Sequence, residues 1–326
     1  MIRLRPLPSP EAAAEAPRLA GGWLRFDRVE LLERGRAPQV LPWSEIPAPD
    51  LARLTAPRPP LAGLTLDRPR IMGILNITPD SFSDGGRHLD PADALARAEA
   101  LAAADILDIG GESTRPGAQA VPASEETARI LPVVEALRDR RLSIDTRKAA
   151  VARAALAAGG DIVNDVAAGA YDPAMFSTVA ETGAPMILMH SVATPETMQD
   201  DPRYDDVIHD VMDALAARIA AAEAAGIPRA RLVVDPGIGF GKTRAHNLAL
   251  LRRIGVFHDL GLPVLLGASR KRFIGDIGGA PQAEDRASGT LAVTLAAVAQ
   301  GVQIHRVHDV APVAQGLALW RAVTEE

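Results

Sequence analysis

Cysteine is absent from all 326 residues of the sequence. The chain therefore cannot form a disulfide, present a thiolate nucleophile or hold a cysteine-ligated metal or iron–sulfur centre. Any chemistry must come from carboxylates, amides, hydroxyls, lysine, arginine and histidine. A chain without cysteine suits a reducing compartment, and the N-terminal sequence MIRLRPLPSP lacks the apolar core of a secretory signal. We therefore expect the protein in the cytoplasm.

Aromatic residues and positive charge are also scarce. The chain has 3 Trp, 2 Tyr and 6 Phe, and 41 acidic residues outnumber 35 Lys and Arg, for a net charge of −6. Nucleic-acid binding needs a cationic face and usually stacking rings, so no nucleic-acid partner is expected.

Long hydrophobic runs are nearly missing as well. The long uncharged stretch at 287–304 is interrupted by polar side chains such as Thr290, Thr294 and Gln300. A membrane span would be more uniformly apolar. The pattern instead predicts a buried helix that ends at Gly301 and leads into a strand, and no membrane partner is expected.

Residues 1–68 differ in composition from the rest of the chain. They contain proline- and arginine-rich segments, including APRPP at 56–60, together with Trp23 and Trp43. Residues 21–35 are compatible with one or two strands and a turn at Gly35. We predict a small N-terminal extension of unknown role packed on the main body, with a partner-binding surface as the alternative. The main domain is predicted at 69–326.

From residue 70 onward, short apolar runs alternate with helical patterns. Helices are predicted from Pro91, after Thr146, which we interpret as a helix cap, and over 204–225. Eight strand–helix units of this size predict an α/β protein, a (β/α)₈ TIM barrel. A doubly wound open sheet alternates in the same way, but no G-x-G-x-x-G follows the first strand, so the barrel is favoured. The runs are IMGILN (71–76), ILDIGG (106–111), LSID (142–145), DIVNDV (161–166), MILMH (186–190), RLVVD (231–235), VLLGAS (264–269) and VQIHRVHD (302–309).

Polar side chains close every one of these runs, and the active site of a TIM barrel lies at the C-terminal ends of its strands. A single residue such as Asn76 or Asp145 has an ordinary alternative as a helix cap. Eight polar ends at one rim favour a site, because buried polar groups need partners. The candidates are Asn76, Glu112, Thr114, Arg115, Asp145, Asn164, Asp165, His190, Asp235, Ser269, Lys271, Arg306, His308 and Asp309.

Two groups separate by chemistry. Asp145, Asn164 and Asp235 suit a flat heterocycle that presents N–H donors. Lys271, Arg306 and His308 follow the last two strands, where TIM barrels commonly bind phosphate. The sequence therefore predicts a ligand with a planar, donor-rich head and an anionic tail. The hydroxyl- and glycine-rich segments 77–87 and 112–124 are predicted to act as lids.

Two other kinds of site are disfavoured. GFGKT at 239–243 is similar to a phosphate loop, but Pro236 stands where that pattern requires glycine. His190, His305 and His308 lie on different strands or alternate faces, which disfavours a zinc site. By strand alternation, His305 is predicted to face away from Arg306 and to be structural.

The motifs resemble those of the dihydropteroate synthases of folate biosynthesis. MGILNITPDSFSDGG at 72–86 and DIGGESTRPGA at 108–118 are the most specific of them. The others follow in the family's order: SIDTRK at 143–148, DIVNDV at 161–166, MH and then TPETMQ within 189–199, DPGIGFGK at 235–242, GASRK at 267–271 and RVHD at 306–309.

This resemblance implies a TIM-barrel transferase that joins 6-hydroxymethyl-7,8-dihydropterin diphosphate to p-aminobenzoate. The products would be 7,8-dihydropteroate and diphosphate, with Mg²⁺ as the cofactor. Stabilisation of the leaving diphosphate, rather than a strong base, would drive the reaction. The resemblance also implies a homodimer, and sulfonamides as mimics of p-aminobenzoate.

The resemblance assigns roles to individual residues. Asp145, Asn164 and Asp235 would hold the edge of the pterin, Lys271 would reach its carbonyl, and Met189 and Phe240 would form apolar walls. Asn76, Arg306 and His308 would contact diphosphate or metal and, with Lys271, act in catalysis. Asn76 and Asp84 are the expected metal ligands. The p-aminobenzoate side would include Phe82, Asp84, Thr114, Arg115, Pro116 and Ser269.

The sequence departs from the family in two places, and two alternatives stay open. Ser191-Val192-Ala193 stands where the family usually has Met-Gln-Gly, and the extension has no counterpart in shorter members. A folate-dependent methyltransferase of the same barrel family would share the pterin carboxylates but not need the SRK and RVHD cations. A non-catalytic pterin-binding homologue would not need both lid motifs intact.

Overall fold

Eight parallel strands form a nearly closed barrel in the computed structural model, which describes residues 1–78, 91–113, 118–192, 197–198 and 200–324. The strand order runs from β10 through β11 and β4 to β9, and a bridge between Val234 and Val264 joins the two ends. The predicted α/β TIM barrel is confirmed. Its strands are β4 (Arg70–Asn76), β5 (Ile106–Gly110), β6 (Leu142–Asp145), β7 (Ile162–Asp165), β8 (Met186–Met189), β9 (Leu232–Asp235), β10 (Leu265–Leu266) and β11 (Ile304–Val307).

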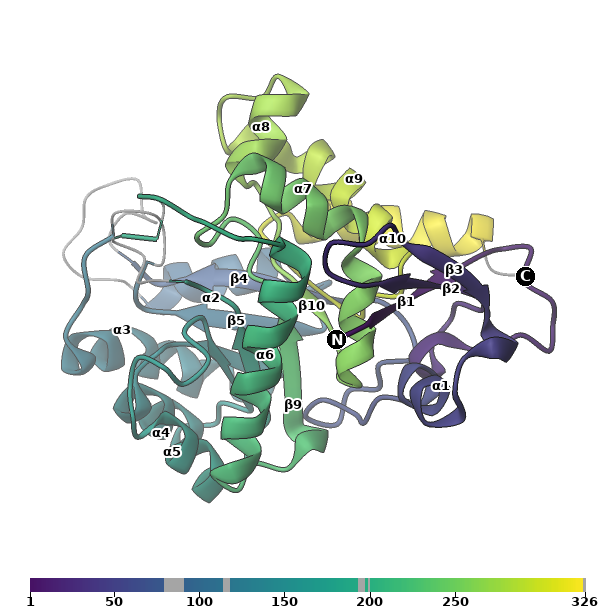
Figure 1. Cartoon of the computed structure of the whole chain (residues 1–326). Helices are drawn as coiled ribbons and strands as arrows, with labels where there is room; N and C mark the ends of the chain where they lie inside the picture. The colour runs from purple at the N-terminus through teal and green to yellow at the C-terminus, as the bar shows by residue number, and fades with distance from the viewer. Residues whose placement is uncertain (79–90, 114–117, 193–196, 199, 325–326) are drawn as a thin grey trace.

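Helices follow the strands and surround the barrel (Figure 1). The helix expected over 204–225 begins later, because Asp206 caps it by accepting from the backbone N–H groups of Ile208 and His209. Thr146 does not cap the next helix directly; that helix begins at Ala149, whose N–H donates to Asp172 at 2.8 Å. The helices are α2 (Pro91–Ala100), α3 (Ala123–Ala136), α4 (Ala149–Ala157), α5 (Met175–Thr182), α6 (Val207–Ala224), α7 (Arg244–Arg252), the 3₁₀ helix η5 (Ile254–Leu260), α8 (Arg272–Gly278), α9 (Ala287–Val298) and α10 (Val310–Thr324).

The interior of the barrel is filled by apolar side chains. Leu61 and Leu66 precede the first barrel strand and pack against this layer. Residues 61–64 form a tight turn there, with Gly63 in the left-handed region at φ +77°. The layer consists of Met72, Ile106, Ile162, Ile187, Val233, Leu265 and Ile304, one from each of seven strands. Because this end is packed, the opposite rim is left to hold a ligand.

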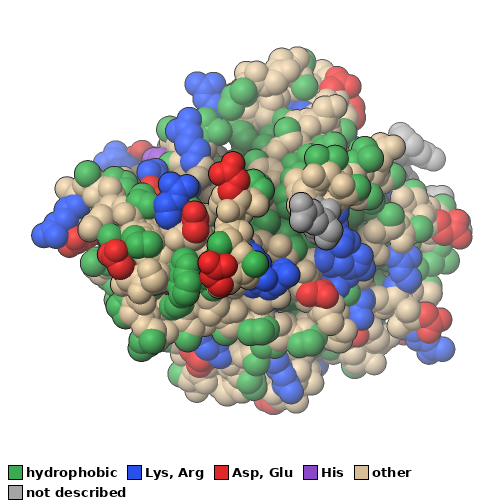
Figure 2. Space-filling view, turned by 90° about the vertical axis from the view of Figure 1, so that its right-hand side faces the viewer, with side chains coloured by type: hydrophobic (Ala, Val, Ile, Leu, Met, Phe, Trp, Pro, Cys, Tyr) green, Lys and Arg blue, Asp and Glu red, His purple; other side chains and the backbone are tan. Residues whose placement is uncertain are grey.

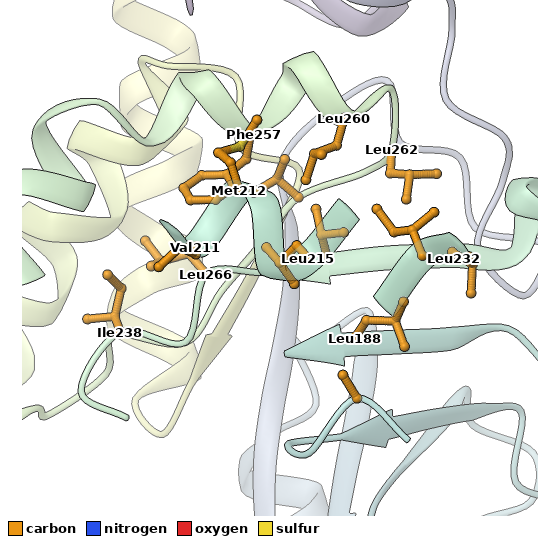
Figure 3. Close-up of a cluster of buried hydrophobic side chains, with 14 of the residues drawn as sticks. Leu188, Val211, Met212, Leu215, Leu232, Ile238, Phe257, Leu260, Leu262 and Leu266 are labelled. Atoms are coloured by element: carbon orange, nitrogen blue, oxygen red, sulfur yellow. The ribbon is translucent and has the colours of Figure 1, made fainter. Parts of the chain in front are cut away.

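A second apolar layer joins the outside of the strands to the helices. Figure 3 shows Leu188 of β8 and Leu232 of β9 facing Leu215 of α6. Phe257 and Leu260 of η5 close the same cluster, and all these side chains are buried. The amphipathic face of α6 thus fixes the last strands in place.

The N-terminal extension has its own antiparallel sheet in the order β1-β2-β3. The expected turn at Gly35 is present, with φ at +70°, but the sheet also contains β1, which the sequence interpretation missed. Phe26 and Val29 are completely buried in the core of the extension. Its elements are β1 (Arg3–Pro8), η1 (Leu19–Gly21), β2 (Phe26–Leu32), β3 (Gln39–Pro42), η2 (Trp43–Glu45) and α1 (Ala48–Thr55).

Apolar and charged contacts hold the extension against the barrel. Leu32 belongs to the large apolar cluster of the barrel. Arg34 pairs with Asp210 of α6 at 2.6 Å, and Arg53 pairs with Asp259 of η5 at 2.6 Å. The face on the right of Figure 1, where β1–β3 and α1 lie, carries cationic and anionic side chains interspersed (Figure 2).

The stretch at 287–304 forms α9, a turn at Gly301 with φ +83°, and then β11, so the predicted helix-to-strand passage is confirmed. The helix is not buried as predicted: it ends at Val298, and only Thr290, Thr294, Ala297 and Val298 are buried, because its other side faces away from the barrel. In the described part of the chain, no helix combines the length and the apolar character needed to cross a bilayer.

Candidate active site

The C-terminal rim of the barrel brings the predicted strand-end residues together. Asn76 ends β4 and Asp145 ends β6, and Gly110 ends the strand between them. A Cβ atom at Gly110 would lie 3.4 Å from Cβ of Asp145 and 3.6 Å from Oδ1 of Asn76. Glycine therefore lets these two polar side chains converge.

Arg306 lies between two buried carboxylates. Its Nε donates to Asp108, and its Nη2 donates to Asp145 at 2.6 Å. Asn164 donates to the same Asp108 at 3.1 Å. Burial opposes the charge on Arg306, but Asp108 and Asp145 outweigh it and raise the pKa of the guanidinium.

This placement differs from our division of the rim into two groups. We assigned Arg306 to the anionic tail, whereas the structure connects it to the carboxylates of the head group. The physical reason is that two buried carboxylates require a cation. Asp108 was missed because it lies inside the run ILDIGG rather than at its end. The feature of the sequence that could have indicated Asp108 is a charged residue within an otherwise apolar strand.

Two carboxylates offer acceptor atoms to a ligand. Oδ1 of Asp145 is buried and has no hydrogen-bond partner among the described residues. Burial raises the pKa of Asp145, and the neighbouring Asp108 adds to the shift. Asp235 accepts from the N–H of Gly237 at 2.7 Å, and burial raises its pKa to about 6. Both are ionised at neutral pH only at a cost, which a donor-rich ligand would offset.

Lys271 and Phe240 form one wall of the site. The Lys271 ammonium lies 4.2 Å from the centre of the Phe240 ring. Burial and the nearby Arg306 lower the pKa of Lys271 to about 8. Phe240 packs in one apolar cluster with Met189, which the sequence also predicted as a wall.

Ser269 and His308 connect the last two strands. The Ser269 hydroxyl accepts from the His308 backbone N–H at 3.1 Å and lies 3.0 Å from Nδ1 of the His308 imidazole. Burial and Arg306 lower the pKa of His308 to about 3, so the ring is neutral at physiological pH. The serine can therefore donate to Nδ1, which leaves Nε2–H as a hydrogen-bond donor.

Lys242 is a residue of the loop after β9 whose role the sequence interpretation missed. Its ammonium donates to the carbonyl oxygens of Gly237 and Phe240, each at 2.9 Å, and to Nδ1 of His190 at 2.9 Å. The side chain is 3% exposed, and burial lowers its pKa to about 7. The phosphate-loop alternative fails, because this ammonium is enclosed by its own loop.

The three histidines considered as zinc ligands have separate partners: His190 contacts Lys242, His305 contacts the Val302 carbonyl and His308 contacts Ser269. The described residues contain no group of three His, Asp or Glu side chains able to hold a metal ion. His305 is fully buried and its Nε2 lies 3.0 Å from the carbonyl oxygen of Val302. It is structural, as its alternation with Arg306 predicted.

A buried charged cluster borders the segment predicted as the second lid. Glu112 binds Arg147 at 2.9 Å and Lys148, and it accepts from the N–H of Val121 at 2.8 Å. Glu126 also binds Lys148. The predicted site residues Phe82, Asp84, Thr114, Arg115 and Pro116 lie outside the described residues, as do most of residues 77–87.

The departure near β8 lies against the loop that follows β9. Val192 is half exposed and lies against Gly241, where a Cβ atom would come within 2.3 Å of Val192 Cγ2. The third residue of the departure, Ala193, lies outside the described residues.

Known proteins are similar to this chain in sequence and architecture. The family model described as pterin binding enzyme matches residues 72–308. Dihydropteroate synthase of Escherichia coli (strain K12) is 47% identical over 243 residues, covering 73% of this chain and 86% of the relative. A probable bifunctional folylpolyglutamate synthase/dihydropteroate synthase of Haloferax volcanii is 50% identical over 242 residues, covering 73% of this chain but 28% of that longer relative.

Solved structures give the same result. Xanthomonas albilineans dihydropteroate synthase with 4-aminobenzoic acid has a TM-score of 0.77 at 49% identity, covering 83% of this chain and 99% of that one. The same enzyme in complex with 7,8-dihydropteroate has a TM-score of 0.75 at 46% identity, covering 83% and 100%. The chain belongs to the pterin-binding enzyme family, among its dihydropteroate synthases.

Proposed function

We propose that the barrel rim joins 6-hydroxymethyl-7,8-dihydropterin diphosphate to p-aminobenzoate, giving 7,8-dihydropteroate and diphosphate. The observation that carries this proposal is the pair of buried acceptors, Oδ1 of Asp145 and the carboxylate of Asp235, beside the Lys271 ammonium. A pterin edge offers adjacent N–H donors to the carboxylates and a carbonyl to the lysine. The complexes of the Xanthomonas albilineans enzyme with 4-aminobenzoic acid and 7,8-dihydropteroate support the choice of substrates.

The chemistry follows from the leaving group. The bond between the pterin methylene carbon and diphosphate breaks, and a new bond forms to the amine nitrogen, which then loses a proton to solvent. The neutral His308 ring has an Nε2–H that would donate to the diphosphate, and the Lys271 ammonium adds positive charge nearby. Arg306 pairs with both Asp108 and Asp145, so the carboxylate of Asp145 is held at the rim before the pterin arrives. His308 and Lys271 would stabilise the negative charge that develops on the diphosphate.

The residues present fit Mg²⁺. Mg²⁺ keeps several waters and substrate phosphates as ligands, so it needs few protein atoms. The described residues offer no three-carboxylate cage, but Oδ1 of Asn76 lies at the rim next to Asp145. We propose Asn76 as a protein ligand, with Asp84 as the second. When bound, the ion would neutralise charge on the leaving diphosphate.

The decisive experiment is a coupled assay for diphosphate release. Purified protein with the pterin diphosphate and Mg²⁺ should release diphosphate only when p-aminobenzoate is added. A protein that binds the pterin but releases no diphosphate would instead be a non-catalytic binding homologue. Methyl transfer from a methylated folate to a cobalt cofactor would support the methyltransferase alternative.

We also propose a homodimer formed through α9 and α10. These helices pack together, and α9 contains no charged residue. The outer face of α10 exposes Leu319 and Val323, at 62% and 84%, one helical turn apart. A second copy of this chain is the partner that would cover them. The absence of cysteine and the folate-pathway substrates support the cytoplasm as the compartment.

A further inference from the structure

Arg270 separates two residues of the site and has an unusual backbone conformation. It lies between Ser269 and Lys271, and its φ angle of +56° falls in the left-handed region. A residue with a Cβ atom adopts this region at a cost, so the surrounding structure must hold it there.

Three residues from other parts of the chain hold Arg270 in this conformation. Its backbone N–H donates to Oγ1 of Thr290 at 3.0 Å, and its carbonyl oxygen accepts from Arg286 at 2.9 Å. Its guanidinium forms a two-bond ion pair with Asp309, with Nε 2.9 Å from Oδ2. Thr290 is 2% exposed and also donates to the carbonyl of Arg286 at 2.9 Å, so the hydroxyl that binds Arg270 is itself held in place.

These contacts fix the backbone at Arg270 and so set the direction in which Ser269 and Lys271 point. Ser269 bonds His308, and Arg270 bonds Asp309, so two consecutive residues after β10 hold two consecutive residues after β11. Lys271, on the other side of Arg270, extends over Phe240. If Arg270 moved to a right-handed conformation, the chain would turn Lys271 and Ser269 away from their present partners.

We propose that Arg270, locked in its left-handed conformation by Asp309, Thr290 and Arg286, is a positioning residue that aims Lys271 at the pterin and Ser269 at His308. This inference rests on the proposed function, because it assigns a pterin to the side of the site that Lys271 faces. Arg270 itself contacts neither substrate in this account. It acts through the conformation of the chain.

Replacing Arg270 with alanine or glycine tests the inference directly. Both variants lose the ion pair, but only alanine keeps the left-handed penalty, since glycine adopts this region freely. We expect Arg270→Ala to bind 6-hydroxymethylpterin about tenfold more weakly than Arg270→Gly. In turnover, Arg270→Ala should raise KM for the pterin diphosphate and lower kcat, and Arg270→Gly should recover part of both losses.

Arg272 provides a matched control two residues away. It is exposed and begins α8, so its backbone is helical. Glycine at this position should be no better than alanine, in contrast with position 270. Asp309→Asn should weaken pterin binding in the wild-type background and have little further effect in Arg270→Gly, where the ion pair is already absent.

The outcomes separate this inference from the proposed function. Failure of the wild-type protein to bind 6-hydroxymethylpterin would refute the proposed function and this inference together. If the wild type binds the pterin, equal losses of pterin affinity in Arg270→Ala and Arg270→Gly would refute the role of the left-handed conformation and leave the proposed function standing. Pterin affinity of Arg270→Ala within twofold of wild type would have the same consequence. Should a variant at position 270 fail to fold, Thr290→Val removes one anchor without touching Arg270, and unchanged pterin affinity in that variant would likewise overturn the inference.

Discussion

Asp235→Asn should make the empty protein more stable while making it a poorer pterin binder. The carboxylate of Asp235 is buried, and burial raises its pKa from 3.8 to about 6. Each pKa unit corresponds to about 1.4 kcal/mol, so the ionised group costs the ligand-free fold up to about 3 kcal/mol at neutral pH. Asparagine keeps the shape and an oxygen for the N–H of Gly237, so much of this cost should disappear.

The pH dependence gives the sign of the effect. Between pH 3.8 and about 6 the folded protein keeps the Asp235 proton that the unfolded chain has lost. The contribution of this group to stability is therefore present below pH 3.8, falls as the pH rises through 6, and stays low above it. The variant lacks this fall. Its advantage over wild type, about 1–3 kcal/mol at pH 7.5, should disappear near pH 4.

Urea unfolding at pH 4 and pH 7.5 measures the stability, and calorimetry with 6-hydroxymethylpterin measures the affinity. The affinity should fall about 10- to 100-fold, because hydrogen bonds to a charged acceptor are worth about 1.5–3 kcal/mol. Asp259→Asn is the control: it removes a buried carboxylate that pairs with Arg53, away from the rim, and should leave pterin affinity unchanged. A less stable Asp235→Asn protein at pH 7.5, or pterin affinity within threefold of wild type, would contradict the reasoning.

Three further predictions concern other parts of the molecule. His308→Ala should weaken binding of the pterin diphosphate about tenfold but change bare-pterin affinity less than twofold, because in the proposed complex the neutral ring donates one hydrogen bond to the diphosphate. His308→Gln should retain part of the affinity for the pterin diphosphate, and an equal loss of affinity for both ligands by calorimetry would show that the ring contacts the pterin head instead. Arg53→Ala leaves the buried Asp259 without its nearest cation and should lower stability by about 1–2 kcal/mol in urea unfolding with unchanged kcat; no change in stability would mean that solvent replaces the pair. The double substitution Leu319→Glu and Val323→Glu should yield a monomer in sedimentation experiments, because it places charge on the exposed face of α10; a dimer that survives it would place the interface elsewhere.

The sequence predicted the barrel and its rim well because both follow from local patterns. Short runs of β-branched and leucine residues mark strands buried on both faces, and the polar residue that ends each run must face the rim. Asp145, Asp235 and His308 were found in this way.

What the sequence could not predict depends on partners far away along the chain. The ion pair of Arg306 with Asp108 joins residues 198 positions apart, and no local pattern indicates it. The low pKa of His308 arises from burial and from Arg306 and Arg270, so its neutral form could not be predicted from residue type. The β1 strand was missed because Pro6 and Pro8 interrupt its pattern, which fits its place at the edge of a small sheet.

The docking of the extension limits how far this protein can be shortened. A chain cut back to the length of its smaller relatives would lose Leu32 from the apolar cluster and the arginine partners of Asp213 and Asp259. Removal of Leu61 and Leu66 would also open the packed end of the barrel. Because side chains of the extension form part of the barrel core, their removal should destabilise the whole protein. Minimal versions made for crystallisation or inhibitor screening should therefore keep the whole N-terminal segment.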